Sequence, residues 1–278
     1  MMETTSEFRC INAEVNYLGP MSVRPEFFAE KYQNNNLNLV PTRIRVEDLR
    51  GHEQETSLEV EGFQLVPHPT AVKNFRDAQE VASVYVPEVQ ALIRRLTGAA
   101  KVVVSGAVLR WGEREAHPEF VNSRPGRFTH VDYSRGSFDE FAAMHLASDP
   151  DKARWLAGRY AAYNIWRVLS PPPQDIPLGL VDARTASYAD VVEGDAVIDA
   201  TGRPEFRFGS SLYRANPRHR WIYFSNMRPD EALVFKAFDS DLTRVQGCPH
   251  SAFDDPSCPP GAVPRSSCEI RAYAYWGS

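Results

Sequence analysis

Residues 220–241, RWIYFSNMRPDEALVFKAFDSD, contain two short apolar segments separated by a run of Asn, Pro and Asp. Segments of this length, rich in aromatic and aliphatic residues and bounded by turn formers, are typical of β-strands. Similar segments lie on both sides: YNIWRVL (163–169), PLGLVDA (177–183), AVIDATG (196–202), SSLYRAN (210–216) and CEIRAYAYW (268–276). With almost no helical pattern between them, they predict a sandwich or jelly roll in the C-terminal half.

The N-terminal half mixes strands with helices. FRCINAEVNYL (8–18), SLEVEGFQLV (57–66) and KVVVSGAVLRW (101–111) predict strands. Apolar residues at helical spacing predict a helix over 77–96, kinked or divided at Pro87 and ended by Gly98. Residues 139–162 predict one or two more helices. The fold class is therefore α+β, with a double-stranded β-helix core (jelly roll or cupin-like) and flanking helices.

The chain reads as a single domain over residues 1–278. An N-terminal mixed α/β support covers 1–120 and the β-helix core covers about 121–276, and no segment between them has the composition of a linker. We expect a monomer or a small homo-oligomer.

Composition excludes several classes of protein. The 278 residues carry a net charge of −5 with acidic and basic residues interleaved, unlike the basic stripe of a nucleic-acid binder. No apolar run approaches the roughly 20 residues that span a bilayer, and the N-terminus lacks a secretory signal pattern. The four cysteines have no C-x-x-C spacing and are interpreted as free thiols of a cytoplasmic protein, although a Cys248–Cys258 disulfide is an open alternative.

The residues 129–132, Thr-His-Val-Asp, are the sharpest chemical feature. Side chains at i and i+2 of a strand point to the same face, so His130 and Asp132 would present an imidazole nitrogen and a carboxylate oxygen to a common point. That is two thirds of the facial triad of two histidines and one carboxylate that binds iron(II) and leaves positions open for co-substrate and dioxygen.

A second histidine must come from a distant strand. His250 lies in CPHSAFDDP, after the strand-like segment ending near Asp239 and before a final strand that begins with an arginine. The remaining histidines lie in turns, loops or a helical pattern: His52, His68, His117, His145 and His219.

The final strand carries candidates for binding 2-oxoglutarate. Arg265, Ser267 and Arg271 alternate onto one face. A guanidinium can hold the far carboxylate of 2-oxoglutarate through two parallel hydrogen bonds, and a hydroxyl two residues on can add a third. Arg265 with Ser267 is the favoured pair, and Arg271 is the reserve candidate.

Several strings, in this order, resemble the hydroxylase/desaturase family of non-heme iron, 2-oxoglutarate-dependent enzymes. They are GFQLVPHPTAVKNF (62–75), YVPEVQALIRRLTGA (85–99), FTHVDYS (128–134), YNIWRVL (163–169), RWIYFSNMRPDEALVFKAFDSD (220–241), PHSAFDDP (249–256) and PRSSCEIR (264–271). The resemblance covers most of the chain. It implies metal ligands at His130, Asp132 and His250, iron(II) and 2-oxoglutarate as cofactors, and oxidation of a small secondary-metabolite substrate with dioxygen, by hydroxylation, desaturation or cyclisation.

One departure concerns Ser105 and Gly106, which stand where members of the family tend to have an Asp-His pair; we expect this position to border the substrate pocket. Lower-ranked substrate or co-substrate candidates are Tyr163, Asn164, Trp166, Arg167, Trp221 and Tyr223. Alternation along a strand separates Asn164 and Trp166 from Tyr163 and Arg167 but does not decide which pair faces the metal.

Two other functions remain open at this point. One is a non-heme iron dioxygenase on the same fold that does not use 2-oxoglutarate. The other is a binding protein that has lost its chemistry.

Overall fold

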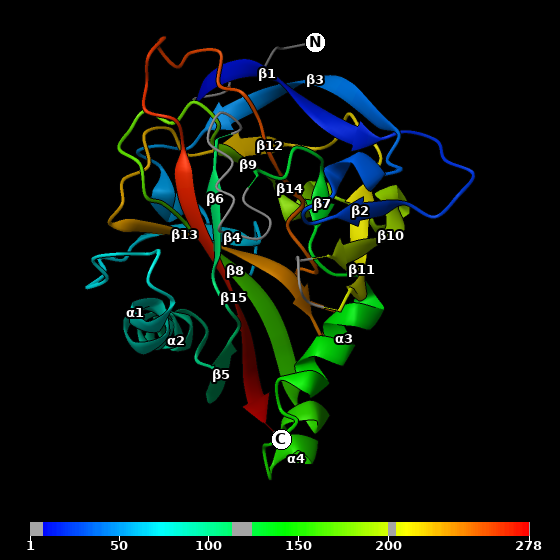
Figure 1. The fold of residues 1–278 in the computed structure, drawn as a ribbon, viewed down its shortest axis with the longest axis vertical. Helices are drawn as coiled ribbons and strands as arrows, with labels where there is room; N and C mark the ends of the chain where they lie inside the picture. The colour runs from blue at the N-terminus through cyan, green and yellow to red at the C-terminus, as the bar shows by residue number, and fades with distance from the viewer. Residues whose placement is uncertain (1–7, 113–123, 200–203, 278) are drawn as a thin grey trace.

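The computed structural model describes residues 8–112, 124–199 and 204–277. They form two sheets that together make the double-stranded β-helix (Figure 1). One sheet has nine strands in the order β1-β3-β12-β9-β14-β7-β11-β10-β2. The other has six, in the order β4-β13-β8-β15-β5, with β6 paired to β15. The predicted fold class is confirmed.

The strands of the nine-stranded sheet are β1 (Arg9–Leu18), β2 (Glu26–Phe28), β3 (Leu39–Asp48), β7 (His130–Val131), β9 (Leu178–Val181), β10 (Val191–Ile198), β11 (Phe206–Tyr213), β12 (Trp221–Tyr223) and β14 (His250–Ala252). Those of the six-stranded sheet are β4 (Phe63–Pro67), β5 (Lys101–Val104), β6 (Val108–Trp111), β8 (Arg159–Val168), β13 (Glu231–Asp239) and β15 (Ser266–Gly277).

A hydrophobic core joins the two sheets. Leu180 and Ile222 of the nine-stranded sheet pack with Trp166, Leu233 and Phe235 of the six-stranded sheet, and all are buried. The inner faces of both sheets therefore meet in one apolar interior, which is what the alternation of the strand segments requires.

The helix predicted over 77–96 is present and covers the outer face of the six-stranded sheet (Figure 1). It consists of α1 (Ala78–Glu80), a π-helical turn over Val81–Tyr85 and α2 (Val86–Thr97). Pro87 lies in the first turn of α2, where a missing N–H costs least, and the π-helical turn precedes it. Gly98 ends the helix in the left-handed conformation at φ 69°.

The helical prediction over 139–162 is wrong at its end. The helices are α3 (Arg135–Met144) and α4 (Lys152–Ala157), and strand β8 begins at Arg159. Residues Tyr160, Ala161 and Ala162 pair with β15, so ladder hydrogen bonds and packing in the sheet override the helical propensity of alanine. The segment 101–111 forms two strands, β5 and β6, in place of the single predicted strand, and Ser105 and Gly106 lie between them.

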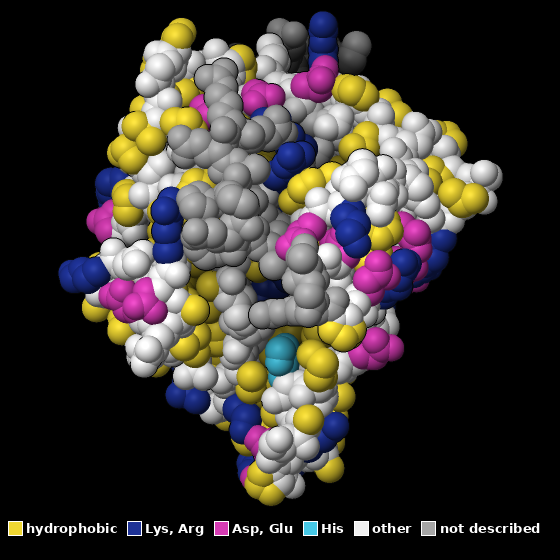
Figure 2. Space-filling view, in the orientation of Figure 1, with side chains coloured by type: hydrophobic (Ala, Val, Ile, Leu, Met, Phe, Trp, Pro, Cys, Tyr) yellow, Lys and Arg dark blue, Asp and Glu magenta, His cyan; other side chains and the backbone are white. Residues whose placement is uncertain are grey.

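All four cysteines are free. No helix among the described residues is long and apolar enough to cross a membrane. On the face in Figure 2, acidic and basic side chains lie intermingled, as the sequence pattern indicates.

Candidate metal centre

His130, Asp132 and His250 converge in the interior of the barrel. One ligand atom from each lies within 4.8 Å of the others, and all three residues are buried. His130 begins β7 and Asp132 directly follows that strand, whereas His250 begins β14.

The register of the nine-stranded sheet explains the convergence. β14 pairs with β7 so that His250 lies directly opposite His130. Residues directly opposite each other in an antiparallel pair share a face, and the two imidazole rings are 4.4 Å apart between centroids. Asp132 reaches the same face by the i, i+2 spacing.

Each imidazole is held through its Nδ1 atom. The Nδ1 of His130 is 2.8 Å from the carbonyl of Phe128, and that of His250 is 3.2 Å from the carbonyl of Cys248. A carbonyl can only accept, so both Nδ1 atoms carry the proton and donate it. Neutral rings in this tautomer direct the lone pair of Nε2 outward, which is the arrangement that metal-binding histidines require.

The carboxylate of Asp132 is held on both oxygens. Arg271 donates to Oδ1 from Nη2 at 2.7 Å and to Oδ2 from Nε at 3.2 Å. Asn164 donates to Oδ2 from Nδ2. Arg271 also donates to Glu269 Oε1 at 2.8 Å, so this guanidinium binds two buried carboxylates.

The charge states at this site suit a divalent cation. Burial, and then the neighbouring His250, lowers the pKa of His130 to about 3, so the ring is neutral at physiological pH. Burial alone would raise the pKa of the Asp132 carboxyl, but the Arg271 guanidinium, the neighbouring imidazoles and the hydrogen bond from Asn164 together outweigh it, and the pKa lies below its usual value. The carboxylate of Asp132 and the neutral imidazole of His130 are thus in the charge states that bind a divalent cation.

Arg265 and Ser267 lie in the interior with unsatisfied polar atoms. Arg265 is 1% exposed and its guanidinium carbon is 5.6 Å from the ring centre of Trp166. Its Nη1 donates to the carbonyl of Ile176 at 2.9 Å, but its Nε and the Ser267 hydroxyl have no hydrogen-bond partner among the described residues. Burial lowers the pKa of Arg265 to about 9. An unpaired buried cation beside a free hydroxyl fits the far carboxylate of 2-oxoglutarate.

The face of β8 that the sequence left undecided is settled by its pairing with β15. Asn164 lies opposite Arg271 and Trp166 opposite Glu269, so both point to the interior. Tyr163 packs in the core under α2 on the other face. Arg167 is on that face too, donating to Tyr85 Oη at 3.0 Å and to the carbonyl of His68 at 2.8 Å.

Trp221 and Tyr223 also lie away from the triad. Ile222 lies between them on β12 and is opposite Leu180 of β9, and Leu180 is in turn opposite His250 of β14. Residues directly opposite each other share a face of the sheet, so Ile222 points inward like His250, and its two neighbours point outward. Trp221 donates to Tyr17 Oη at 2.9 Å. Four candidate side chains therefore lie on strand faces that point away from the metal centre: Tyr163, Arg167, Trp221 and Tyr223.

The other described histidines have separate roles. His52 is 2.7 Å from Glu55, His68 contacts Arg167, and His219 bridges Tyr17 and Asp190. His145 packs against Tyr273 at 4.9 Å between ring centres. His117 lies outside the described residues.

A cavity of about 260 Å³ opens beside His130 and Asp132. The sequence alone does not predict most of the residues that line this cavity. They lie on β2, β10, β11 and the segment before β7, which are separate parts of the chain. Gly126 is one signal that could have been used: a Cβ there would lie 3.1 Å from His130 Cε1, so only glycine fits without displacement. The lining includes Arg271 but neither Ser105 nor Gly106; Ser105 donates to the carbonyl of Arg271 at 2.8 Å and lies behind that residue.

A jelly-roll barrel with an H-x-D pair and a distant histidine on its inner face defines a mononuclear non-heme iron oxygenase. Comparisons agree with this class. A family model described as an oxidoreductase/YMDC permease-like domain matches residues 15–275. The hydroxylase/desaturase efuI of Hormonema carpetanum is 32% identical over 252 residues, covering 84% of this chain and 83% of that protein.

Two further similarities concern one other protein. The Fe(II)/2-oxoglutarate-dependent dioxygenase nvfI of Aspergillus novofumigatus is 29% identical over 249 residues, covering 87% of this chain and 86% of the relative. A solved structure of the iron and alpha-ketoglutarate-dependent endoperoxidase NvfI has a TM-score of 0.82 at 26% identity and covers 98% of this chain and all of that one. The chain belongs to this oxidoreductase family and is a non-heme iron, 2-oxoglutarate-dependent oxygenase of the hydroxylase/desaturase type.

Proposed function

We propose that His130, Asp132 and His250 bind the iron and that the enzyme oxidises a small secondary-metabolite substrate by hydroxylation, desaturation or cyclisation. The observation that carries the assignment of the ligands is the convergence of their three ligand atoms within 4.8 Å in the buried interior. When bound, iron and 2-oxoglutarate would react with dioxygen to supply an oxidant that removes hydrogen from carbon, with release of succinate and carbon dioxide.

The chain's own residues supply orientation and a dry interior. The carbonyls of Phe128 and Cys248 hold the imidazoles in one tautomer. Arg271 and Asn164 fix the rotation of the Asp132 carboxylate. Arg265 and Ser267 would anchor the far carboxylate of 2-oxoglutarate, because their free polar atoms lie in the same interior.

We further propose a cytoplasmic monomer or small homo-oligomer that acts on free small molecules and binds neither nucleic acid nor membranes. The four free thiols and the intermingled surface charges support this proposal. Light scattering on the purified protein measures the oligomeric state.

The ligand assignment is tested by replacing each ligand separately. We expect His130→Ala, Asp132→Ala and His250→Ala to lose stoichiometric iron and the iron-dependent conversion of 2-oxoglutarate to succinate, while circular dichroism shows a folded chain. The triad completes a metal site, whereas the apolar core does not depend on it for burial.

His52→Ala is the matched control, since His52 pairs with Glu55 on the surface and should leave iron content and turnover unchanged. Full iron binding and turnover in His250→Ala, with another histidine proving essential, would show that the third ligand is misassigned. Turnover of the substrate without release of succinate would show that the reaction does not use 2-oxoglutarate.

A further inference from the structure

The cavity beside the triad is lined by two chemically different sets of residues. One is apolar and aromatic: Phe27, Phe128, Phe208, Val197 and Ile198. The other carries four guanidinium groups: Arg110, Arg124, Arg127 and Arg271. Among the described residues of the lining, Asp132 is the one carboxylate. The composition of the cavity therefore suits a molecule that has an apolar part and an anionic part.

The four arginines of the cavity lining differ in their partners. Arg271 binds Asp132 and Glu269, and Arg127 makes two 2.9 Å hydrogen bonds to Asp254. Arg110 is 3.6 Å from Glu269. Arg124 differs, because its side chain makes no ion pair with a carboxylate anywhere in the described part of the chain.

The Arg124 guanidinium lies over an aromatic ring. Its central carbon lies 4.7 Å from the ring centre of Tyr32, a cation–π contact that covers one face of the group. Arg124 is exposed and lines the cavity, and a guanidinium that stacks through its face keeps the N–H donors of its edge for another partner. A planar carboxylate is the anion that matches such an edge with two parallel hydrogen bonds.

Arg124 is also close to the metal ligands along the chain. A Cβ at Gly126 would lie 3.1 Å from the His130 ring, so the two residues are close, and the carbonyl of Gly126 accepts a 2.8 Å hydrogen bond from the backbone N–H of Ala252 in β14. Arg124 is two residues before Gly126. Because two residues of extended chain span at most about 7 Å, the backbone of Arg124 lies within about 7 Å of the backbone of Gly126. Two aromatic residues of the lining also lie near the metal ligands: the ring centre of Phe128 is 4.8 Å from that of His130, and the ring centre of Phe27 is 4.9 Å from that of Phe128.

We propose that the substrate is a small carboxylic acid with an apolar, ring-bearing carbon skeleton. Its carboxylate is bound by Arg124 over Tyr32, and its skeleton lies against Phe27 and Phe128 beside the metal. The volume of about 260 Å³ limits the skeleton to a small molecule. This inference rests on the proposed function, since it takes the triad as the reacting centre.

Binding of three matched probes tests the inference. They are 3-phenylpropanoate, its methyl ester and 3-phenylpropyl phosphate, titrated by ligand-observed NMR into protein loaded with zinc(II) and saturating 2-oxoglutarate. We expect the acid to bind at least about tenfold more tightly than the ester, since a charge-assisted bidentate contact contributes about 1.5–3 kcal/mol. Arg124→Gln should abolish this preference and leave the affinity for the ester unchanged.

Arg218→Gln is the control, because Arg218 is an exposed arginine outside the cavity lining and should keep the preference. Tyr32→Ala should weaken binding of the acid by removing the surface on which the guanidinium stacks. Equal binding of acid and ester, rejection of both, or a preference that survives in Arg124→Gln overturns the proposal. Tighter binding of the phosphate than of the acid assigns the anion site to phosphate esters and also overturns it.

A separate measurement distinguishes this inference from the proposed function. The absorption band that 2-oxoglutarate gives on iron(II) is recorded anaerobically for the wild type and for Arg124→Gln. A missing band in the wild type contradicts the proposed function. A normal band in both proteins, without any preference for the acid, contradicts only the inference about the substrate.

Discussion

At the scale of single residues, the centre depends on which donors surround each charged group. Arg271 and Arg265 lie on the same strand, yet their environments differ. Arg271 is engaged with Asp132 and Glu269, and these attractions outweigh burial and raise its pKa. Arg265 is buried without a carboxylate partner among the described residues. An occupied guanidinium is poorly placed to bind a co-substrate, whereas an unpaired buried one gains most from an incoming carboxylate.

We therefore predict different losses for the two arginines. Arg265→Ala should raise the dissociation constant of 2-oxoglutarate by about a hundredfold or more with iron binding intact, since truncating one partner of a buried charge pair costs about 2–5 kcal/mol. Arg271→Ala should weaken iron binding by about 10–100-fold, because Asp132 loses its main donor. Anaerobic titrations of iron and of 2-oxoglutarate measure both constants.

Arg265→Lys is the conservative variant and should restore little affinity, because an ammonium lacks the planar pair of donors. Loss of 2-oxoglutarate affinity in Arg271→Ala alone, with Arg265→Ala unaffected, would reverse the two roles.

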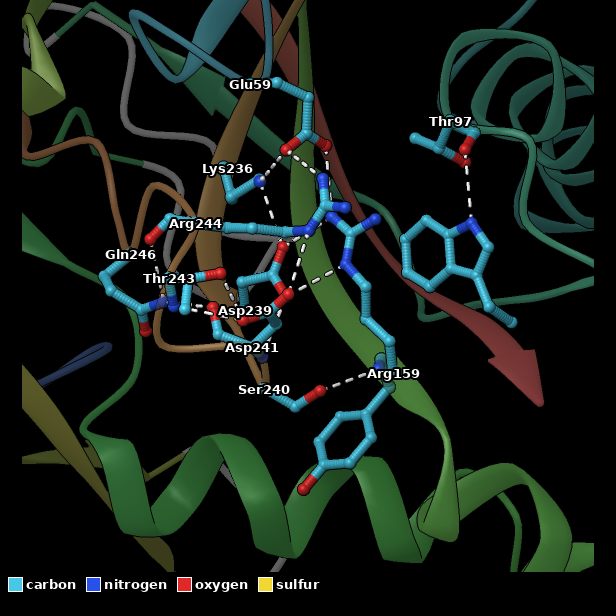
Figure 3. Close-up of polar contacts among 12 residues, drawn as sticks. Glu59, Thr97, Arg159, Lys236, Asp239, Ser240, Asp241, Thr243, Arg244 and Gln246 are labelled. Carbon is cyan, nitrogen blue, oxygen red and sulfur yellow. Dashed lines mark hydrogen bonds and ion pairs between the residues drawn. The ribbon is translucent and has the colours of Figure 1, made fainter. Parts of the chain in front are cut away.

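At the scale of elements, β8 and β13 are joined by a buried network of charges (Figure 3). Lys236 and Asp239 are both fully buried, with Nζ 3.0 Å from Oδ2. Asp239 also accepts from Arg159 at 2.6 and 3.1 Å, and Glu59 binds Lys236 and Arg159 from outside the two strands. The network lies where β13 shifts register between Lys236 and Phe238 and where β8 starts, in the place of the predicted helix.

We predict that Asp239→Asn destabilises the fold by about 3–5 kcal/mol, because it leaves the buried Lys236 ammonium and the Arg159 guanidinium without their shared carboxylate. Urea unfolding measures the change. Asp230→Asn is the control, since the Asp230–Arg228 pair is more than half exposed and should matter by less than about 1 kcal/mol. Equal small changes in both variants would mean that the network does not stabilise this junction.

At the scale of the whole molecule, strands from the two halves of the sequence share both sheets. β3 pairs with β12, and β4 pairs with β13. Residues 1–120 were expected to form a support for the core. In the structure, strands of this segment are hydrogen-bonded to strands of the core in both sheets. A single domain remains our prediction.

Limited proteolysis checks that prediction. Residues 171–175 and 255–264 are both rich in proline, and by composition alone each is a candidate for early cleavage. The structure favours 255–264, because Gln174 is buried and donates to the carbonyl of Met227 at 3.0 Å, and Asp175 accepts from the Arg265 backbone. Fragments that stay associated on gel filtration are expected. Two separately folded fragments divided near residue 120 would contradict the single domain.

Local spacing determined the parts of this protein that depend on a few consecutive residues. The strand segments, the helix ended by Gly98 and the shared face of His130 and Asp132 follow from backbone geometry, so the sequence predicts them directly. The strand at Arg159 was missed because its local pattern is helical and its partners lie more than a hundred residues away in β15.

Tertiary structure alone decided which faces turn inward and which distant residues meet. Alternation divides β8 into two faces, but only its pairing with β15 places Asn164 at Asp132 and Arg167 under α2. The same holds for the cavity, where Phe27 and Arg124 come from separate segments that carry no local sign of their proximity. Long-range register is set by the burial of apolar faces between sheets, and that burial involves residues from the whole chain.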